Sequence, residues 1–136
     1  GNEKVAEVWT HGVNGTTFGG NPVACAAGIA VIDALTSKEM GRHIDDVSKY
    51  LISRLQSLQG KFPIIKEVRG KGLMIGVELT VESSPLVDAM LDDGVLVNST
   101  AGNVVRILPP LIASKQEIDL LLVAFEKALA NYGRGV

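Results

Sequence analysis

Three stretches of the sequence hold residue types that could bind a ligand, and the first is a loop rich in glycine and threonine. Residues 15–22 read Gly-Thr-Thr-Phe-Gly-Gly-Asn-Pro. Two hydroxyls and several unhindered backbone amides before a helix N-terminus suit an anion such as phosphate. The spacing alone favours a different interpretation, a glycine-rich linker whose threonines bond to their own backbone. No Gly-Lys-Ser/Thr follows, so the loop is not a Walker phosphate loop.

The second stretch is an apolar run interrupted by one charge, Arg106. The run extends from Val104 to Pro110. A charge among branched apolar residues costs free energy unless it is paired. A guanidinium is a planar fork that fits a carboxylate through two hydrogen bonds. Arg106 therefore either faces solvent on an edge strand or binds an anion, and the alternation of side chains along a strand leaves both interpretations open.

The third stretch, residues 69–76, contains Gly70, Gly72 and Gly76 and superficially resembles a dinucleotide-binding fingerprint. The third glycine comes one position too late, and a strand is expected where the fingerprint requires a helix. We interpret the stretch as a turn between two strands. The 2 histidines and 1 cysteine of the chain are too few and too scattered for a metal site, so no metal is expected.

The composition is that of a globular domain and argues against several classes of partner. The chain has 136 residues, of which 46% are hydrophobic and 21% charged, and a formal net charge of -2. This charge gives no reason to expect binding to nucleic acid or to an anionic membrane. No apolar run reaches the roughly 20 residues of a membrane helix. A single cysteine, Cys25, excludes an intramolecular disulfide, and we expect a cytoplasmic location.

The elements that must position these residues follow from capping and periodicity. Asn21 and Pro22 are typical of a helix start, and Ser114 with Glu117 forms a capping box before another helix. We predict helices at 22–35, 37–58, 85–93 and 115–132. The last three of these helices are expected to end at Gly60, Gly94 and Gly133. We predict strands at 64–69, 73–79, 95–98 and 104–108. Residues 2–9 could form a helix or a strand. This order predicts an α+β fold, a small antiparallel sheet with helices on one face.

Three segments, taken together, resemble the class III pyridoxal-phosphate-dependent aminotransferases, and among them the acetylornithine aminotransferases. They are residues 15–26, 68–79 and 105–112, and their order and spacing agree over nearly the whole chain. The resemblance implies a fold-type I enzyme that works as a homodimer with shared active sites. It implies that residues 1–21 end the large domain and include the cofactor-phosphate loop. Residues 22–35 would then be a connecting helix, and residues 36–136 the C-terminal small domain.

The resemblance also implies roles for individual residues. Thr17, with its neighbour Thr16, would bind the phosphate of pyridoxal phosphate across the dimer interface, and Arg106 would hold the α-carboxylate of amino-acid and 2-oxo-acid substrates. The chain departs from the family at Asn14, where a histidine is usual. The family's cofactor-carrying lysine lies upstream of the threonine loop, and none of this chain's lysines has a matching context. We therefore expect no catalytic residue in this chain, no cofactor on it in isolation, and no activity of its own.

The resemblance implies a parent enzyme that transfers an amino group between N-acetylornithine and 2-oxoglutarate in arginine biosynthesis. The alternatives are another class III aminotransferase, acting on ornithine, succinylornithine or 4-aminobutyrate, and a stand-alone binding module that kept the fold without catalysis.

Overall fold

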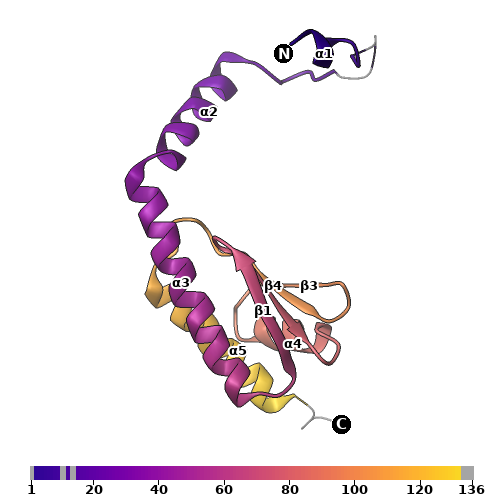
Figure 1. Cartoon of the computed structure of the whole chain (residues 1–136), viewed down its shortest axis with the longest axis vertical. Helices are drawn as coiled ribbons and strands as arrows, with labels where there is room; N and C mark the ends of the chain where they lie inside the picture. The colour runs from indigo at the N-terminus through magenta and orange to yellow at the C-terminus, as the bar shows by residue number, and fades with distance from the viewer. Residues whose placement is uncertain (1, 10–11, 13–14, 133–136) are drawn as a thin grey trace. The chain divides into compact units, whose positions relative to one another are not determined.

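The computed structural model describes residues 2–9, 12 and 15–132, apart from the side chain of Val5. The chain divides into two compact units, Gly1–Thr36 and Ser37–Val136, which are described separately (Figure 1). Residues 2–9, for which the sequence left helix and strand open, contain a short helix, α1 (Glu3–Ala6). The position of Asn14 and the predicted helix stop at Gly133 lie outside the described residues.

The first unit contains α1 and one longer helix, α2 (Pro22–Leu35), whose predicted bounds are confirmed. Asn21 caps α2, because its side-chain Oδ1 accepts a hydrogen bond from the Ala24 N–H at 3.0 Å. Pro22 occupies the first helical position, where a missing N–H costs nothing. No side chain of α2 is buried within the described structure, although the helix is mainly apolar.

The second unit consists of a four-stranded sheet and three helices that cover one of its faces. The sheet order is β1-β2-β4-β3, and every pair is antiparallel. Helices α3 and α5 lie side by side across the sheet, and α4 packs against α5 and β3 (Figure 1). The predicted α+β class with helices on one face is confirmed. The elements are α3 (Lys38–Lys61), β1 (Ile65–Lys71), β2 (Met74–Leu79), α4 (Ser84–Asp92), β3 (Asn98–Thr100), β4 (Val104–Ile107) and α5 (Lys115–Asn131).

Alternation along the central strands separates a buried face from an open one. Ile75 and Val77 of β2, with Val105 and Ile107 of β4, are fully buried against the helices. They meet Phe125 of α5 and the leucine stripe of α3 in one core. Burying such a side chain contributes about 1.5–3 kcal/mol, so the register of the central strands is strongly fixed. The side chains between these positions must point to the other face.

Several predicted boundaries were wrong, and the strand predicted at 64–69 extends to Lys71. Two of the differences have a clear reason. Helix α3 continues through Gly60 to Lys61 and ends at Phe62, whose extended conformation is the one required before Pro63. The strand predicted at 95–98 is found at Asn98–Thr100. Val95 instead closes the end of α4, donating its N–H to the Met90 carbonyl at 2.9 Å.

The start of α4 also differs from the prediction. Ser83, not Ser84, precedes the first helical residue, and its side chain makes no capping bond. Its buried hydroxyl lies 2.7 Å from the Ser99 hydroxyl and donates to the Gly102 carbonyl. The serine therefore ties α4 to the turn between β3 and β4 instead of capping the helix.

Candidate functional site

Arg106 lies on an interior strand, so the prediction that it could sit on an edge strand was wrong. Its strand, β4, is hydrogen-bonded to β2 on one side and β3 on the other. Arg106 is opposite Gly76 of β2 and Asn98 of β3. Because its neighbours Val105 and Ile107 point into the helical core, the Arg106 side chain points to the opposite side of the sheet. We call this side the open face; it carries Glu67, Arg69, Lys71, Met74, Gly76, Glu78, Asn98, Thr100, Val104 and Arg106.

The open face is hollowed beside Arg106. The hollow measures about 300 Å³ and is lined by residues of all four strands, including Arg69, Thr100 and Arg106. Gly76 keeps the space open, because a Cβ at that position would lie 3.3 Å from the Val104 Cγ1. Gly70 serves the sheet itself, since a Cβ there would come within 2.6 Å of the Met74 carbonyl oxygen. One glycine therefore shapes the hollow and the other permits the strands beside it to pair.

The Arg106 guanidinium has no partner in the described part of the chain. Its Nε is buried without a hydrogen bond, and no carboxylate of the described residues forms an ion pair with it. A buried unpaired N–H costs roughly 1–3 kcal/mol. A protein tolerates such a cost where a ligand supplies the missing acceptor. A carboxylate approaching through the hollow would meet a planar, permanently charged donor.

The charges of the open face nearest to Arg106 are already paired. Glu78 accepts a hydrogen bond from Lys66 Nζ at 2.6 Å and another from Arg69 Nη1 at 2.6 Å. Arg69 also contacts Glu67 at 2.7 Å. The hydrogen bonds from Lys66 and then Arg69 hold the pKa of the Glu78 carboxyl below its usual value. Lys71, at the end of β1 on the same face, also forms no ion pair within the described residues, but it does not line the hollow. Arg106 is therefore the unpaired cation that an anion in the hollow would meet, within the described residues.

The segment after Arg106 is anchored at several points. The Ala113 N–H donates to the Pro110 carbonyl at 2.9 Å, and the Ala113 carbonyl lies 3.1 Å from His43 Nε2 of α3. The predicted capping box follows at once and is confirmed, with the Ser114 N–H donating to Glu117 at 2.8 Å. This backbone donation lowers the pKa of the Glu117 carboxyl, ahead of the contribution of the Ser114 hydroxyl. The end of β4 is therefore held by both α3 and α5.

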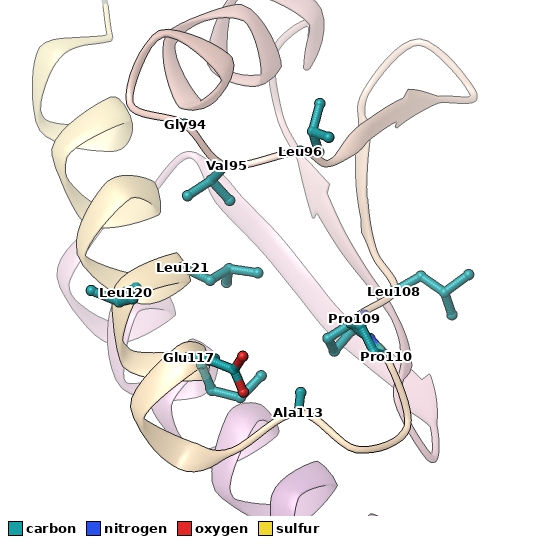
Figure 2. A pocket seen from close by; sticks show the side chains of 11 residues that line it. Gly94, Val95, Leu96, Leu108, Pro109, Pro110, Ala113, Glu117, Leu120 and Leu121 are labelled. Atoms are coloured by element: carbon teal, nitrogen blue, oxygen red, sulfur yellow. The ribbon is translucent and has the colours of Figure 1, made fainter.

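A second hollow, of about 400 Å³, lies between this segment and α5 (Figure 2). Its lining is mainly apolar, and Val95, Leu121 and the two prolines contribute to it. Glu117 is its only charged lining residue, and the capping box already uses that carboxylate. Leu108 points away from α5 (Figure 2). The second hollow offers packing surface and lacks the free polar groups that chemistry requires, so the hollow of Arg106 is the candidate site.

The two threonines predicted to bind phosphate lie in the first unit and differ in their surroundings. The Thr16 hydroxyl accepts a hydrogen bond from the Gly19 N–H at 3.0 Å, so it shapes the loop. Thr17 is exposed, and its hydroxyl makes no hydrogen bond within the described residues. The loop leads directly into the N-terminus of α2. Arg106 belongs to the other unit.

Sequence reasoning missed the groups that surround Arg106. Glu78 and Arg69 are nine positions apart, and only the pairing of β1 with β2 makes them neighbours. No periodicity along one strand could reveal that contact. In the described ranges, no group of three or more His, Cys, Asp or Glu residues is arranged to hold a metal ion. None of the described helices is both long and apolar enough to cross a membrane.

The comparisons with known proteins agree on one family. The class-III aminotransferase pattern matches residues 1–129. An acetylornithine aminotransferase of Methanocaldococcus jannaschii is 42% identical over 129 residues, covering 95% of this chain and 32% of its own length. Ornithine aminotransferase 1 of Staphylococcus aureus is 38% identical, with coverages of 96% and 32%.

A solved structure agrees as well. The ornithine aminotransferase of Toxoplasma gondii, described as having pyridoxal phosphate at partial occupancy in its active site, superposes with a TM-score of 0.79 at 30% identity. The match covers 96% of this chain and 32% of that one. The chain thus spans about a third of the length of the proteins it matches. With a family pattern over nearly all of its residues, this chain belongs to the class III aminotransferases.

Proposed function

We propose that this chain is the C-terminal part of an enzyme that transfers an amino group between N-acetylornithine and 2-oxoglutarate, in arginine biosynthesis. The observation that carries the proposal is the unpaired Arg106 guanidinium beside its hollow. The similarity to acetylornithine aminotransferases supports the choice of substrate. In this assignment residues 1–21 end the large domain, residues 22–35 form the helix that connects the two domains, and residues 36–136 form the small domain. The enzyme would be a cytoplasmic homodimer.

Arg106 would bind the α-carboxylate of each substrate. Both half-reactions begin with an amino acid or a 2-oxo acid, so one permanent cation can serve both. The interior position of β4 fixes the backbone of Arg106 on two sides, and the anchored segment after Pro110 limits movement at the end of the strand. A fork held in this way orients a carboxylate as well as attracting it.

Thr17 and Thr16 would hold the phosphate of pyridoxal phosphate. The exposed Thr17 hydroxyl makes no hydrogen bond within the described residues, while Thr16 holds the loop through Gly19. The N-terminus of α2 follows, and its partial positive charge favours a phosphate. These features fit the group. When bound, pyridoxal phosphate supplies the electron-withdrawing ring and the carbonyl that takes the amino group. The lysine that carries the cofactor would come from outside this chain, which by itself would have no transaminase activity.

A second candidate is an ornithine aminotransferase, because relatives with that name are 38% identical over nearly the whole chain. Comparing kcat/KM for N-acetylornithine and for ornithine separates the candidates. A preference for free ornithine would replace the first candidate with the second.

The test of the Arg106 role is Arg106→Lys in the full-length enzyme to which this chain belongs under the proposal. We expect kcat/KM for both substrates to fall about 10²-fold, or ~3 kcal/mol, because a charged bidentate contact is lost. Cofactor affinity should not change. Arg42→Lys is a matched control, since Arg42 is exposed on α3, where it pairs with Glu39 and donates to the Lys38 carbonyl. Normal kinetics for Arg106→Lys would refute the assignment.

A further inference from the structure

Glu78 is close enough to Arg106 to compete with a ligand for it. Glu78 is opposite Val104, and Gly76 is opposite Arg106, so Glu78 and Arg106 are diagonal neighbours on the open face. Diagonal neighbours have Cβ atoms about 7–8 Å apart, a gap that long side chains span. No large side chain intervenes at position 76. An internal carboxylate therefore lies within reach of the guanidinium that is left unpaired.

The Glu78 carboxylate is turned away from Arg106 by two other cations. Its Oε1 accepts from Lys66 Nζ at 2.6 Å and its Oε2 from Arg69 Nη1 at 2.6 Å. Each oxygen is therefore engaged. The Glu78 side chain is only 17% exposed, whereas the side chains of Lys66 and Arg69 are 62% and 46% exposed. The cations come from the outer strand β1 and hold the carboxylate toward that edge of the sheet.

Arg69 has a second task that makes it hard to replace. Glu67 is directly opposite Glu78, and like charges in that position repel. Arg69 Nη1 contacts both carboxylates, at 2.7 Å and 2.6 Å. Without Arg69, Glu67 would push Glu78 away from β1. The unpaired cation on the other side is Arg106.

We propose that Lys66 and Arg69 are positioning residues that hold the Glu78 carboxylate off Arg106 and so keep the anion site open. The inference rests on the proposed role of Arg106 as a carboxylate-binding group. A tethered carboxylate acts at an effective concentration in the millimolar range or above, so its release would weaken binding of a free carboxylate. We expect a loss of affinity of about 10-fold, which removal of the Glu78 charge should reverse.

The experiment uses the 136-residue chain, labelled with ¹⁵N, and follows the Nε–Hε signal of Arg106. The probe is 2-oxoglutarate. In the wild type this signal, which comes from a buried donor without a hydrogen bond, should shift on titration. In Lys66→Met/Arg69→Met it should be shifted and protected before any ligand is added, and the dissociation constant should rise about 10-fold. Adding Glu78→Gln should restore both properties.

Two further variants keep the result interpretable. Arg69→Met alone, which keeps Lys66, should show the same changes to a smaller extent if the double variant is too unstable to study. Lys61→Met removes an exposed ion pair with Glu126, away from the open face, and should change neither the Arg106 signal nor the dissociation constant. Weakened binding that Glu78→Gln does not restore, or an Arg106 signal unaffected by loss of both cations, would overturn the inference.

The same experiment distinguishes a failure of the proposed function from a failure of this inference. If 2-oxoglutarate shifts no signal, or shifts signals equally in Arg106→Met, Arg106 is not the carboxylate-binding group. The pairing of Glu78 with Arg106 in the ligand-free variants can still be read from the Nε–Hε signal. Its presence supports the positioning role and its absence refutes it.

Discussion

Replacing Arg106 with methionine should stabilise the second unit. The wild-type Nε is buried without a hydrogen bond, while in the unfolded chain it bonds to water. Methionine preserves much of the apolar stem and removes the unpaired group. A residue retained for ligand binding is expected to carry such a cost, since the site is optimised for the bound state.

The size of the effect follows from the single atom involved. An unsatisfied buried donor costs about 1–3 kcal/mol, and only Nε among the side-chain nitrogens of Arg106 is buried and unpaired. We therefore take the lower end of this energy range and expect the free energy of unfolding to rise by about 1 kcal/mol. With a urea m-value of about 1 kcal/mol/M, the midpoint should increase by roughly 1 M.

The assay is urea unfolding of the 136-residue chain, followed by far-ultraviolet circular dichroism. Arg69→Met is the matched control, because Arg69 is on the same face but is paired with two carboxylates; its midpoint should fall. A midpoint for Arg106→Met that falls by half a molar or more, at unchanged m, would mean that Arg106 stabilises the folded chain. The reasoning that reserves it for a ligand would then be wrong.

Two other predictions concern the sheet. Gly70→Ala should lower the free energy of unfolding by about 1–3 kcal/mol, because the added Cβ would lie 2.6 Å from a backbone oxygen. Gly60→Ala should raise it by about 0.5–1 kcal/mol, because Gly60 lies inside α3 and an added Cβ would have no atom within 4 Å. Thermal unfolding of both variants checks the two expectations. Glu78 has a lowered pKa, so its contribution to stability is full above the pKa of the unfolded carboxyl and is lost as pH falls through the lower folded value. Urea midpoints measured from pH 6 downward should therefore fall more steeply in the wild type than in Glu78→Gln, and parallel curves would contradict this.

The features that could be predicted from sequence are those whose partners are close along the chain. Asn21 contacts the N–H three residues on, and Ser114 and Glu117 bond to each other, so the caps of α2 and α5 could be identified without tertiary information. Arg106 stood out because its surroundings in the sequence are apolar. Its two interpretations could not be separated, because the choice depends on which strands flank β4.

The features that could not be predicted depend on strand register and tertiary contacts. The position of β3 is set by pairing with β4, while Val95 is drawn into the end of α4. The role of Ser83 depends on the turn it meets in space. The charge pairing of Glu78 is likewise a contact between strands. Local preference is a weak guide for such residues, because packing decides among conformations that differ little in propensity.

The interior position of β4 limits how this site can be changed by evolution or engineering. A strand bonded on both sides cannot shift its backbone by a residue without reversing the faces of Val105 and Ile107, so Arg106 is a fixed point. Under the role proposed for Arg106, new substrate shapes would have to be accommodated by neighbours that contribute little to the core. Thr100 and Met74 line the hollow and are both exposed, so a library aimed at altered substrate range should vary these two positions and leave the arginine alone.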